Sequence, residues 1–164
     1  MKKLRSLVAL TVAGISSTFA WDISGTFEDK GVAVSSESMD SPTVVSLQAL
    51  LNLEFNAQLG VATYANATEV QIDPGRSNLD LKILGAEGTL LGDVSWSIEN
   101  YQATEGGGVM VRIRSPRSAD DSYVLLLETI NEGQLLQAKV MQVEATTFGP
   151  KYQELGTYFF PRAT

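Results

Sequence analysis

Residues 44–56 read Val-Val-Ser-Leu-Gln-Ala-Leu-Leu-Asn-Leu-Glu-Phe-Asn, and the conformation of this stretch decides the fold class. Its odd positions, from Val45 to Phe55, are all apolar, whereas its even positions are polar with two exceptions. A period of two residues places these sets on opposite faces of one strand. The composition would also suit a helix, and a proline before it and a glycine after it are common helix boundaries. At about 100° per residue, however, the apolar side chains would scatter around the helix. We therefore predict one long strand whose odd face lies in the core.

Short alternating runs separated by turn residues continue through the rest of the chain. The expected strands are residues 21–27, 32–34, 57–64, 69–72, 79–83, 89–101, 109–113, 123–130, 135–143 and 152–160. Residues 73–76 form an Asp-Pro-Gly-Arg turn, and residues 131–134, Asn-Glu-Gly-Gln, predict a hairpin. About ten strands without a convincing helix predict a single all-β domain over residues 21–164. The preferred fold is an antiparallel β-barrel of about 8–10 strands, and a two-sheet β-sandwich is the alternative.

Two similar triplets lie near the two ends of this domain, Gly25-Thr26-Phe27 and Gly156-Thr157-Tyr158. If the terminal strands are neighbours, the glycines allow a barrel to close tightly. The first triplet resembles the Gly-x-Trp opening of lipocalin-type barrels, with Phe27 in place of tryptophan. This resemblance covers about seven residues, and the other motifs of that family are not found. It implies a lipocalin-like fold and no particular function.

Residues 1–20 have the three parts of a secretory signal peptide. A cationic head that contains Lys2, Lys3 and Arg5 precedes an apolar run at residues 7–15. The last residues are small at the positions that signal peptidase reads, so we predict cleavage after Ala20. The apolar run is shorter than the roughly 20 residues of a membrane-spanning helix. The Met-Lys-Lys start is typical of bacteria, and we expect a periplasmic or secreted protein.

The composition excludes several kinds of chemistry. The chain of 164 residues contains no cysteine and no histidine. It therefore has no disulfide, no Ser-His-Asp or Cys-His catalytic system and no ordinary zinc or copper site, and we expect no cofactor. The net charge of −7 falls to −10 in the mature chain, because the three charges of the signal peptide are positive. Such an acidic chain is not expected to bind nucleic acid or anionic membranes.

Five residues are the candidate ligand contacts. Trp96 and Tyr64 are large aromatics that can line an apolar cavity, although such residues more often lie in the core. Glu54 interrupts an apolar and amide-bearing strand and is a ligand contact if the even face of that strand looks into a cavity. Arg112 and Arg114 belong to the only basic concentration and can clamp an anion, with neutralisation by nearby aspartates as the alternative.

Carboxylates supply the remaining candidates for chemistry. Glu54 and Glu128 both interrupt apolar strands and are the acids to test for glycan hydrolysis, although no pair stands out among the 19 acids. The aspartates that offer oxygen ligands to calcium lie in loops or beside a turn and lack the bidentate glutamate of an EF-hand; they are Asp73, Asp80, Asp120 and Asp121. We assign no catalytic residue and no metal ligand on this basis.

These observations favour a non-catalytic, exported β-barrel that binds an apolar or amphipathic small ligand inside. One alternative is a structural or assembly protein of the bacterial cell envelope or surface. Its support is the amide-rich and charge-poor face of residues 44–56, which does little to prevent self-association through a strand edge. The less favoured alternative is a carboxylate-based enzyme that acts on glycans.

Overall fold

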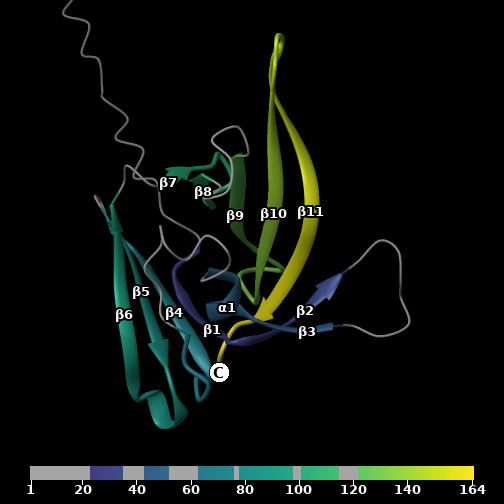
Figure 1. The fold of residues 1–164 in the computed structure, drawn as a ribbon. Coiled ribbons are helices and arrows are strands. Elements are labelled where there is room, and N and C mark those ends of the chain that lie inside the picture. The colour runs from purple at the N-terminus through teal and green to yellow at the C-terminus, as the bar shows by residue number, and fades with distance from the viewer. Residues whose placement is uncertain (1–22, 35–42, 52–62, 76–77, 98–100, 115–121) are drawn as a thin grey trace, which may run out of the picture.

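The computed structural model describes residues 23–34, 43–51, 63–75, 78–97, 101–114 and 122–164. This part of the chain is mainly β structure in two sheets (Figure 1). The first sheet contains β1 (Gly25–Glu28), β4 (Glu69–Pro74), β5 (Asn78–Leu84) and β6 (Leu90–Ser97). The second contains β2 (Lys30–Val34), β3 (Thr43–Ser46), β7 (Tyr101–Ala103), β8 (Val109–Arg114), β9 (Ser122–Ile130), β10 (Leu135–Thr146) and β11 (Gly149–Pro161). The helical elements are α1 (Leu47–Leu51) and the 3-10 turn η1 (Ala86–Gly88).

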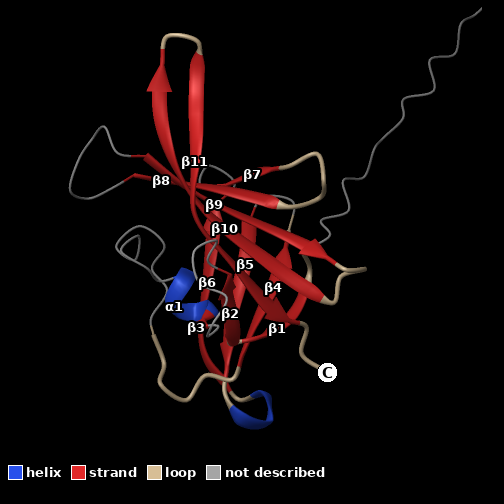
Figure 2. Cartoon of the chain, turned by 90° about the vertical axis from the view of Figure 1, so that its right-hand side faces the viewer, coloured by secondary structure: helices blue, strands red, loops and turns tan. Residues whose placement is uncertain are grey.

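All the strand pairs in these two sheets are antiparallel, so the predicted mainly β, antiparallel architecture is confirmed. The four-stranded sheet has the order β1-β4-β5-β6, and the seven-stranded sheet has the order β3-β2-β11-β10-β9-β8-β7 (Figure 2). The strands of the described segments form no closed barrel. The hairpin predicted at residues 131–134 is present between β9 and β10, with Asn131 and Glu132 at positive φ.

The two sheets are joined at a corner near the N-terminus. β1 lies in the four-stranded sheet, and after Asp29 the chain continues as β2 in the seven-stranded sheet. A strand that bends from one sheet into the other is a common way to make such a corner. On the same side, Phe27 forms an isolated antiparallel bridge with Arg162, and the Ala163 amide donates to the Thr26 carbonyl over 2.9 Å. The two ends of the domain are therefore neighbours, the condition that the sequence left open.

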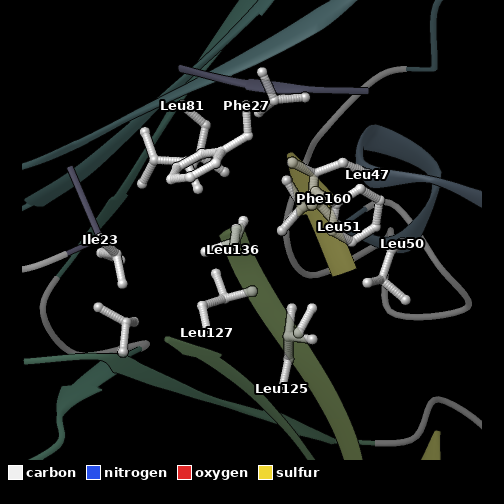
Figure 3. Close-up of a cluster of buried hydrophobic side chains, with 14 of the residues drawn as sticks. Ile23, Phe27, Leu47, Leu50, Leu51, Leu81, Leu125, Leu127, Leu136 and Phe160 are labelled. Atoms are coloured by element: carbon white, nitrogen blue, oxygen red, sulfur yellow. The ribbon is translucent and has the colours of Figure 1, made fainter. Parts of the chain in front are cut away.

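A single cluster of buried apolar side chains fills the space between the sheets (Figure 3). Side chains from both sheets and from α1 are fully or almost fully buried there. The cluster includes Phe27, Ile72, Leu79, Leu81, Trp96, Val109, Val111, Leu125, Leu127, Leu136, Phe160, Leu47, Leu50 and Leu51. Burial of this apolar surface is the main stabilising contribution in a chain that has no disulfide.

The prediction of one long strand at residues 44–56 is wrong. The strand β3 ends at Ser46, and α1 follows at once with Leu47, Leu50 and Leu51 buried. Ser46 acts as the N-cap, because its hydroxyl accepts a hydrogen bond from the Ala49 amide over 3.1 Å. The Asp29 carboxylate accepts a hydrogen bond from another amide at the start of the helix, that of Gln48, over 2.9 Å. Residues 52–56 lie outside the described part of the chain.

Arg162 holds the corner together through three interactions. Its Nε donates to the Gly133 carbonyl over 2.6 Å, and its Nη2 donates to the Ser24 carbonyl over 3.2 Å. Its guanidinium carbon lies 5.0 Å from the centre of the Phe27 ring. The side chain also occupies the space that a Cβ atom at Gly25 would need. Arg162 therefore connects β1, the β9–β10 turn and the end of β11.

Replacing Arg162 with methionine is expected to lower the free energy of unfolding by about 1–2 kcal/mol. The two carbonyls lose a charged donor, and the cation–π contact disappears, while the apolar stem is kept. Urea denaturation of the purified protein measures this loss. The control is Lys82→Met at an exposed position on β5, for which a change within about 0.5 kcal/mol is expected. Equal effects of the two substitutions would contradict the role of Arg162 at the corner.

The predicted signal peptide, residues 1–20, lies outside the described residues, and its cleavage after Ala20 stays a prediction. Within the described segments, no helix has both the length and the apolar character needed to span a membrane.

Candidate functional site

The candidate ligand contacts do not all lie in one described site. Trp96, on β6, is only 3% exposed and belongs to the core cluster. Tyr64 is half-buried and packs where a Cβ atom at Gly92 would otherwise lie. The backbones of Arg112 and Arg114 are in β8 of the other sheet. Glu54 lies outside the described residues. A ligand-binding role for any of these five residues stays a prediction.

Tyr64 is positioned by a buried glutamine rather than by a strand. Gln48, on α1, donates from Nε2 to the Tyr64 carbonyl over 2.7 Å. Its Oε1 accepts from the Tyr64 amide, also over 2.7 Å. One side-chain amide thus satisfies both backbone groups of Tyr64, as a neighbouring strand would. The sequence left undecided whether the even face of residues 44–56 is an exposed edge or looks into a cavity. In the structure, Gln48 and the apolar exception Leu50 on that face are buried, because the helix turns them inward.

Of the two acids proposed for glycan hydrolysis, Glu54 lies outside the described residues, so a pair with Glu128 is not tested. Glu128, on β9, is half-buried and lies beside the loop glycine Gly108. Asp73 and Asp80 face each other across β4 and β5, where Asp80 accepts a hydrogen bond from Asn78 Nδ2 over 2.7 Å. Asp120 and Asp121 lie outside the described residues. The described segments contain no group of three or more acidic residues arranged to hold a metal ion.

Because the space between the sheets is filled by side chains, a site for a small ligand has to be sought elsewhere. One open hollow of about 500 Å³ lies near the C-terminus. Its lining is largely polar and is formed by Glu28, Lys30, Ala65, Asn66, Ala67, Thr68, Glu69, Ala163 and Thr164. Charges of both signs and the backbone of a turn dominate this hollow, which gives little apolar surface for an amphipathic molecule.

A second open hollow, of about 680 Å³, lies on the seven-stranded sheet across β2, β11 and β10. We call it the outer-face groove, because most of its side chains point away from the core. It is lined by Ala33, Val34, Gln137, Lys139, Glu154, Leu155, Gly156, Thr157, Tyr158 and Phe159. The groove thus combines exposed apolar side chains with one cation and one carboxylate.

A β-bulge shapes this groove. Gly156 pairs with Val140 and Glu154 pairs with Met141, so Leu155 is an extra residue without a partner in that ladder. Such a bulge bends its strand and increases the local twist. It also places Leu155 and Glu154 on the same side of the sheet, where both line the groove. The irregular strand β11 therefore produces a concave surface where a regular one would be flatter.

The walls of the groove are apolar at its two ends. Val34 is 57% exposed and Leu155 is 51% exposed, which is unusual for such side chains on neighbouring strands. Beyond Val34, the exposed Val32 and Val44 face the same side, because Val32 pairs with Val44 and with Phe159. The apolar surface therefore continues from the groove onto β3.

The polar side chains of the groove lie between these apolar ends. Thr157 is buried and donates its hydroxyl hydrogen to Glu154 Oε1 over 2.5 Å. Lys139 is directly opposite Thr157 on β10. The sequence signal that could have located this site is the Leu-Gly pair at residues 155–156, since glycine inside a strand often marks a bulge.

No family model matches the chain, and neither does any curated protein or solved structure.

Proposed function

We propose that this protein is an exported, non-catalytic binding protein that holds an apolar or amphipathic small ligand in the outer-face groove. The observation that supports this proposal is the exposure of Val34 and Leu155 in a hollow of about 680 Å³ that also contains Lys139. Ligand pockets of this size usually combine apolar walls with a few polar groups that orient the ligand. The sequence analysis expected the ligand inside the domain. We instead propose a ligand site on the outer face, because core side chains occupy the space between the sheets.

We also propose that the domain is a two-sheet β-sandwich with a joined corner rather than a closed barrel. The corner at Asp29 and the bridge between Phe27 and Arg162 connect the sheets on one side. The remaining edge strands are β6 in the four-stranded sheet and β3 and β7 in the seven-stranded sheet. In the described segments, none of these three strands pairs with a strand of the opposite sheet. A packed core between two such layers leaves the outer sheet surface as the place for binding.

The groove suits a ligand with an apolar tail and an acidic head. Its apolar walls favour a hydrocarbon group, and the ammonium group of Lys139 favours an anion. The Glu154 carboxylate, which accepts a hydrogen bond from Thr157, repels an anion, so we expect the acidic head beside Lys139 and away from Glu154. A fatty acid analogue is therefore the probe of choice, and export of the protein places it where such molecules can be captured.

Replacing Val34 with serine is expected to weaken binding of a fluorescent fatty acid analogue about five- to tenfold. The substitution removes roughly 1–1.4 kcal/mol of apolar contact. Fluorescence titration measures the dissociation constant. Lys139→Gln is expected to weaken binding of the acidic probe more than binding of a neutral hydrophobic dye. The matched control is Val44→Ser, which lies outside the groove and is exposed to a similar degree. If none of these probes shows saturable binding to the protein, the proposed function is wrong.

A structural or assembly role at the cell envelope is the second candidate. It is favoured by a specific observation, the exposed apolar side chains beyond the groove, Phe148 in the turn after β10 and Tyr152 on β11. The carboxylate enzyme has less support, because only Glu128 of the two candidate acids lies in the described residues.

A further inference from the structure

The strands β10 and β11 extend beyond the rest of their sheet (Figures 1 and 2). In the described residues, β9 pairs with β10 only as far as Val143, and β2 pairs with β11 only at residues 157–159. Residues 141–155, which we call the hairpin arm, therefore form a two-stranded ribbon over most of their length. At its tip Phe148 is fully exposed to solvent, and Tyr152 lies halfway along. An isolated ribbon of this kind is only marginally stable in water.

The apolar face of β10 changes sides where the arm begins. In the first half of the strand, the buried residues are Leu136, Ala138 and Val140, which face the core. From Met141 onward, the apolar residues occupy the alternate positions, and β10 has no extra residue that would restore them to the core side. Side chains alternate across a strand, so the apolar face of the arm points away from the core.

The cross-strand pairs show that β11 follows the same pattern. Directly paired residues share a face. One face of the arm contains Met141, Val143, Ala145, Pro150 and Tyr152, with Glu154 and the bulged Leu155 at its base. The opposite face contains Gln142, Glu144, Thr146, Lys151 and Gln153, where Glu144 and Lys151 are opposite each other. The arm is therefore amphipathic: near its base Met141 and Val143 are half-buried beside the buried Val124, and toward its tip Ala145, Pro150 and Tyr152 are exposed.

We propose that this apolar face packs against the arm of a second copy of the chain, in antiparallel orientation about a two-fold axis. The tip is about seven residues from the bulge, or about 24 Å along the ribbon. In this orientation Phe148 of each copy reaches Leu155 at the base of the other arm, and the two Tyr152 side chains lie near the axis. Both partners use the same patch, as a closed two-fold dimer requires. This proposal does not rest on the proposed ligand-binding function of the groove.

Three features favour this arrangement over other ways of covering the arm. First, residues 145–150 carry no charge, so the tip can be buried on a second copy without desolvating an ion. Second, Pro150, Lys151 and the bulge at Leu155 obstruct edge-to-edge pairing of β11, which directs association to the face. Third, the apolar residues run from base to tip, which suits an extended partner of the same shape.

The expected dimer is weak and reversible. Two ribbons about 10 Å wide, together with the two Phe148 side chains, bury on the order of 1,000–1,200 Å² in total. This is the low end for specific interfaces, so we expect a dissociation constant in the micromolar range. The net charge, −7 for the full chain and −10 without residues 1–20, makes the two copies repel each other, and added salt is expected to strengthen the dimer by screening.

Sedimentation equilibrium of the purified protein at about 1–300 µM tests the proposal. The wild type is expected to shift from monomer to dimer, Tyr152→Ser to weaken the dimer at least tenfold, and the neighbouring Gln153→Ser on the opposite face to leave it unchanged.

Since the chain has no cysteine, Thr147→Cys and Leu155→Cys variants can then be mixed and oxidised. A mixed disulfide between the tip and the base supports the antiparallel arrangement, and disulfides only between identical variants overturn it. A monomer at every concentration also overturns the proposal, whether or not it binds phosphatidylcholine vesicles through Phe148.

Discussion

Replacing Phe160 with alanine is expected to lower the free energy of unfolding by about 3–5 kcal/mol. Phe160 is fully buried on β11, opposite Leu136, and its ring lies beside the leucines of α1 (Figure 3). The ring also fills the space next to Gly31, where a Cβ atom would collide with it. One side chain therefore contacts two neighbouring strands and the helix, and its removal leaves a cavity that rigid neighbours cannot close.

The neighbouring residue provides the control for this substitution. Phe159 points to the opposite side of β11, is half-buried, and lines the outer-face groove. We expect Phe159→Ala to cost about 1 kcal/mol, because less apolar area leaves water when the protein folds. Urea denaturation followed by tryptophan fluorescence measures both losses. Equal losses would show that the alternation of β11 between the core and the groove is assigned incorrectly.

Replacing Asp29 with alanine is expected to lower the free energy of unfolding by about 2–4 kcal/mol. The carboxylate is buried and accepts hydrogen bonds from the Ser46 hydroxyl over 3.0 Å and from the Gln48 amide over 2.9 Å. The Asp29 backbone donates to the Thr68 carbonyl and accepts from the Leu47 amide. The residue therefore fixes the corner between the sheets and the start of α1 at the same time.

The Asp29→Asn variant separates the loss of an acceptor from the loss of the charge. Both hydrogen bonds end on Oδ1, an oxygen that asparagine keeps, so the variant loses the charge but not the acceptor, and a loss of at most about half that of alanine is expected. Ser46→Ala removes the N-cap and the hydrogen bond that the hydroxyl donates to Asp29, and it is expected to cost about 1–2 kcal/mol. Urea denaturation gives all three values. A loss below about 1 kcal/mol for Asp29→Ala would contradict the role of this carboxylate at the corner.

The groove and the hairpin arm lie on the same side of the seven-stranded sheet and meet at Leu155. A ligand in the groove and an arm from a second copy would therefore compete for that side chain. Both surfaces arise from β11, in which a bulge separates a half that borders the core from a half that projects. Binding by the monomer and association of the arms are thus two consequences of one irregular strand.

Some elements followed directly from local sequence patterns. The strands at residues 123–130 and 135–143 and the turn between them were predicted because alternation and turn residues are local signals. The change of apolar positions after Val140 is also visible in the sequence, but its meaning depends on knowing which face of β10 meets the core. The groove depends on which strands are neighbours, and β2 and β11 are more than 110 residues apart in the chain.

The sequence by itself determined that the described domain is built mainly from antiparallel strands. Periodicity and turn chemistry act over a few residues, and both were sufficient for this conclusion. That the two ends lie together was shown only by the contacts of Phe27 with Arg162 and of Thr26 with Ala163. The conformation of residues 47–51 within this stretch was decided by tertiary structure. Their two-residue alternation favours a strand, but the Asp29 carboxylate and the buried place for Leu47, Leu50 and Leu51 stabilise a helix from Leu47 onward. Those contacts come from the corner residue Asp29, 19 residues before Gln48, and from the packed core, so no pattern within the stretch could reveal them.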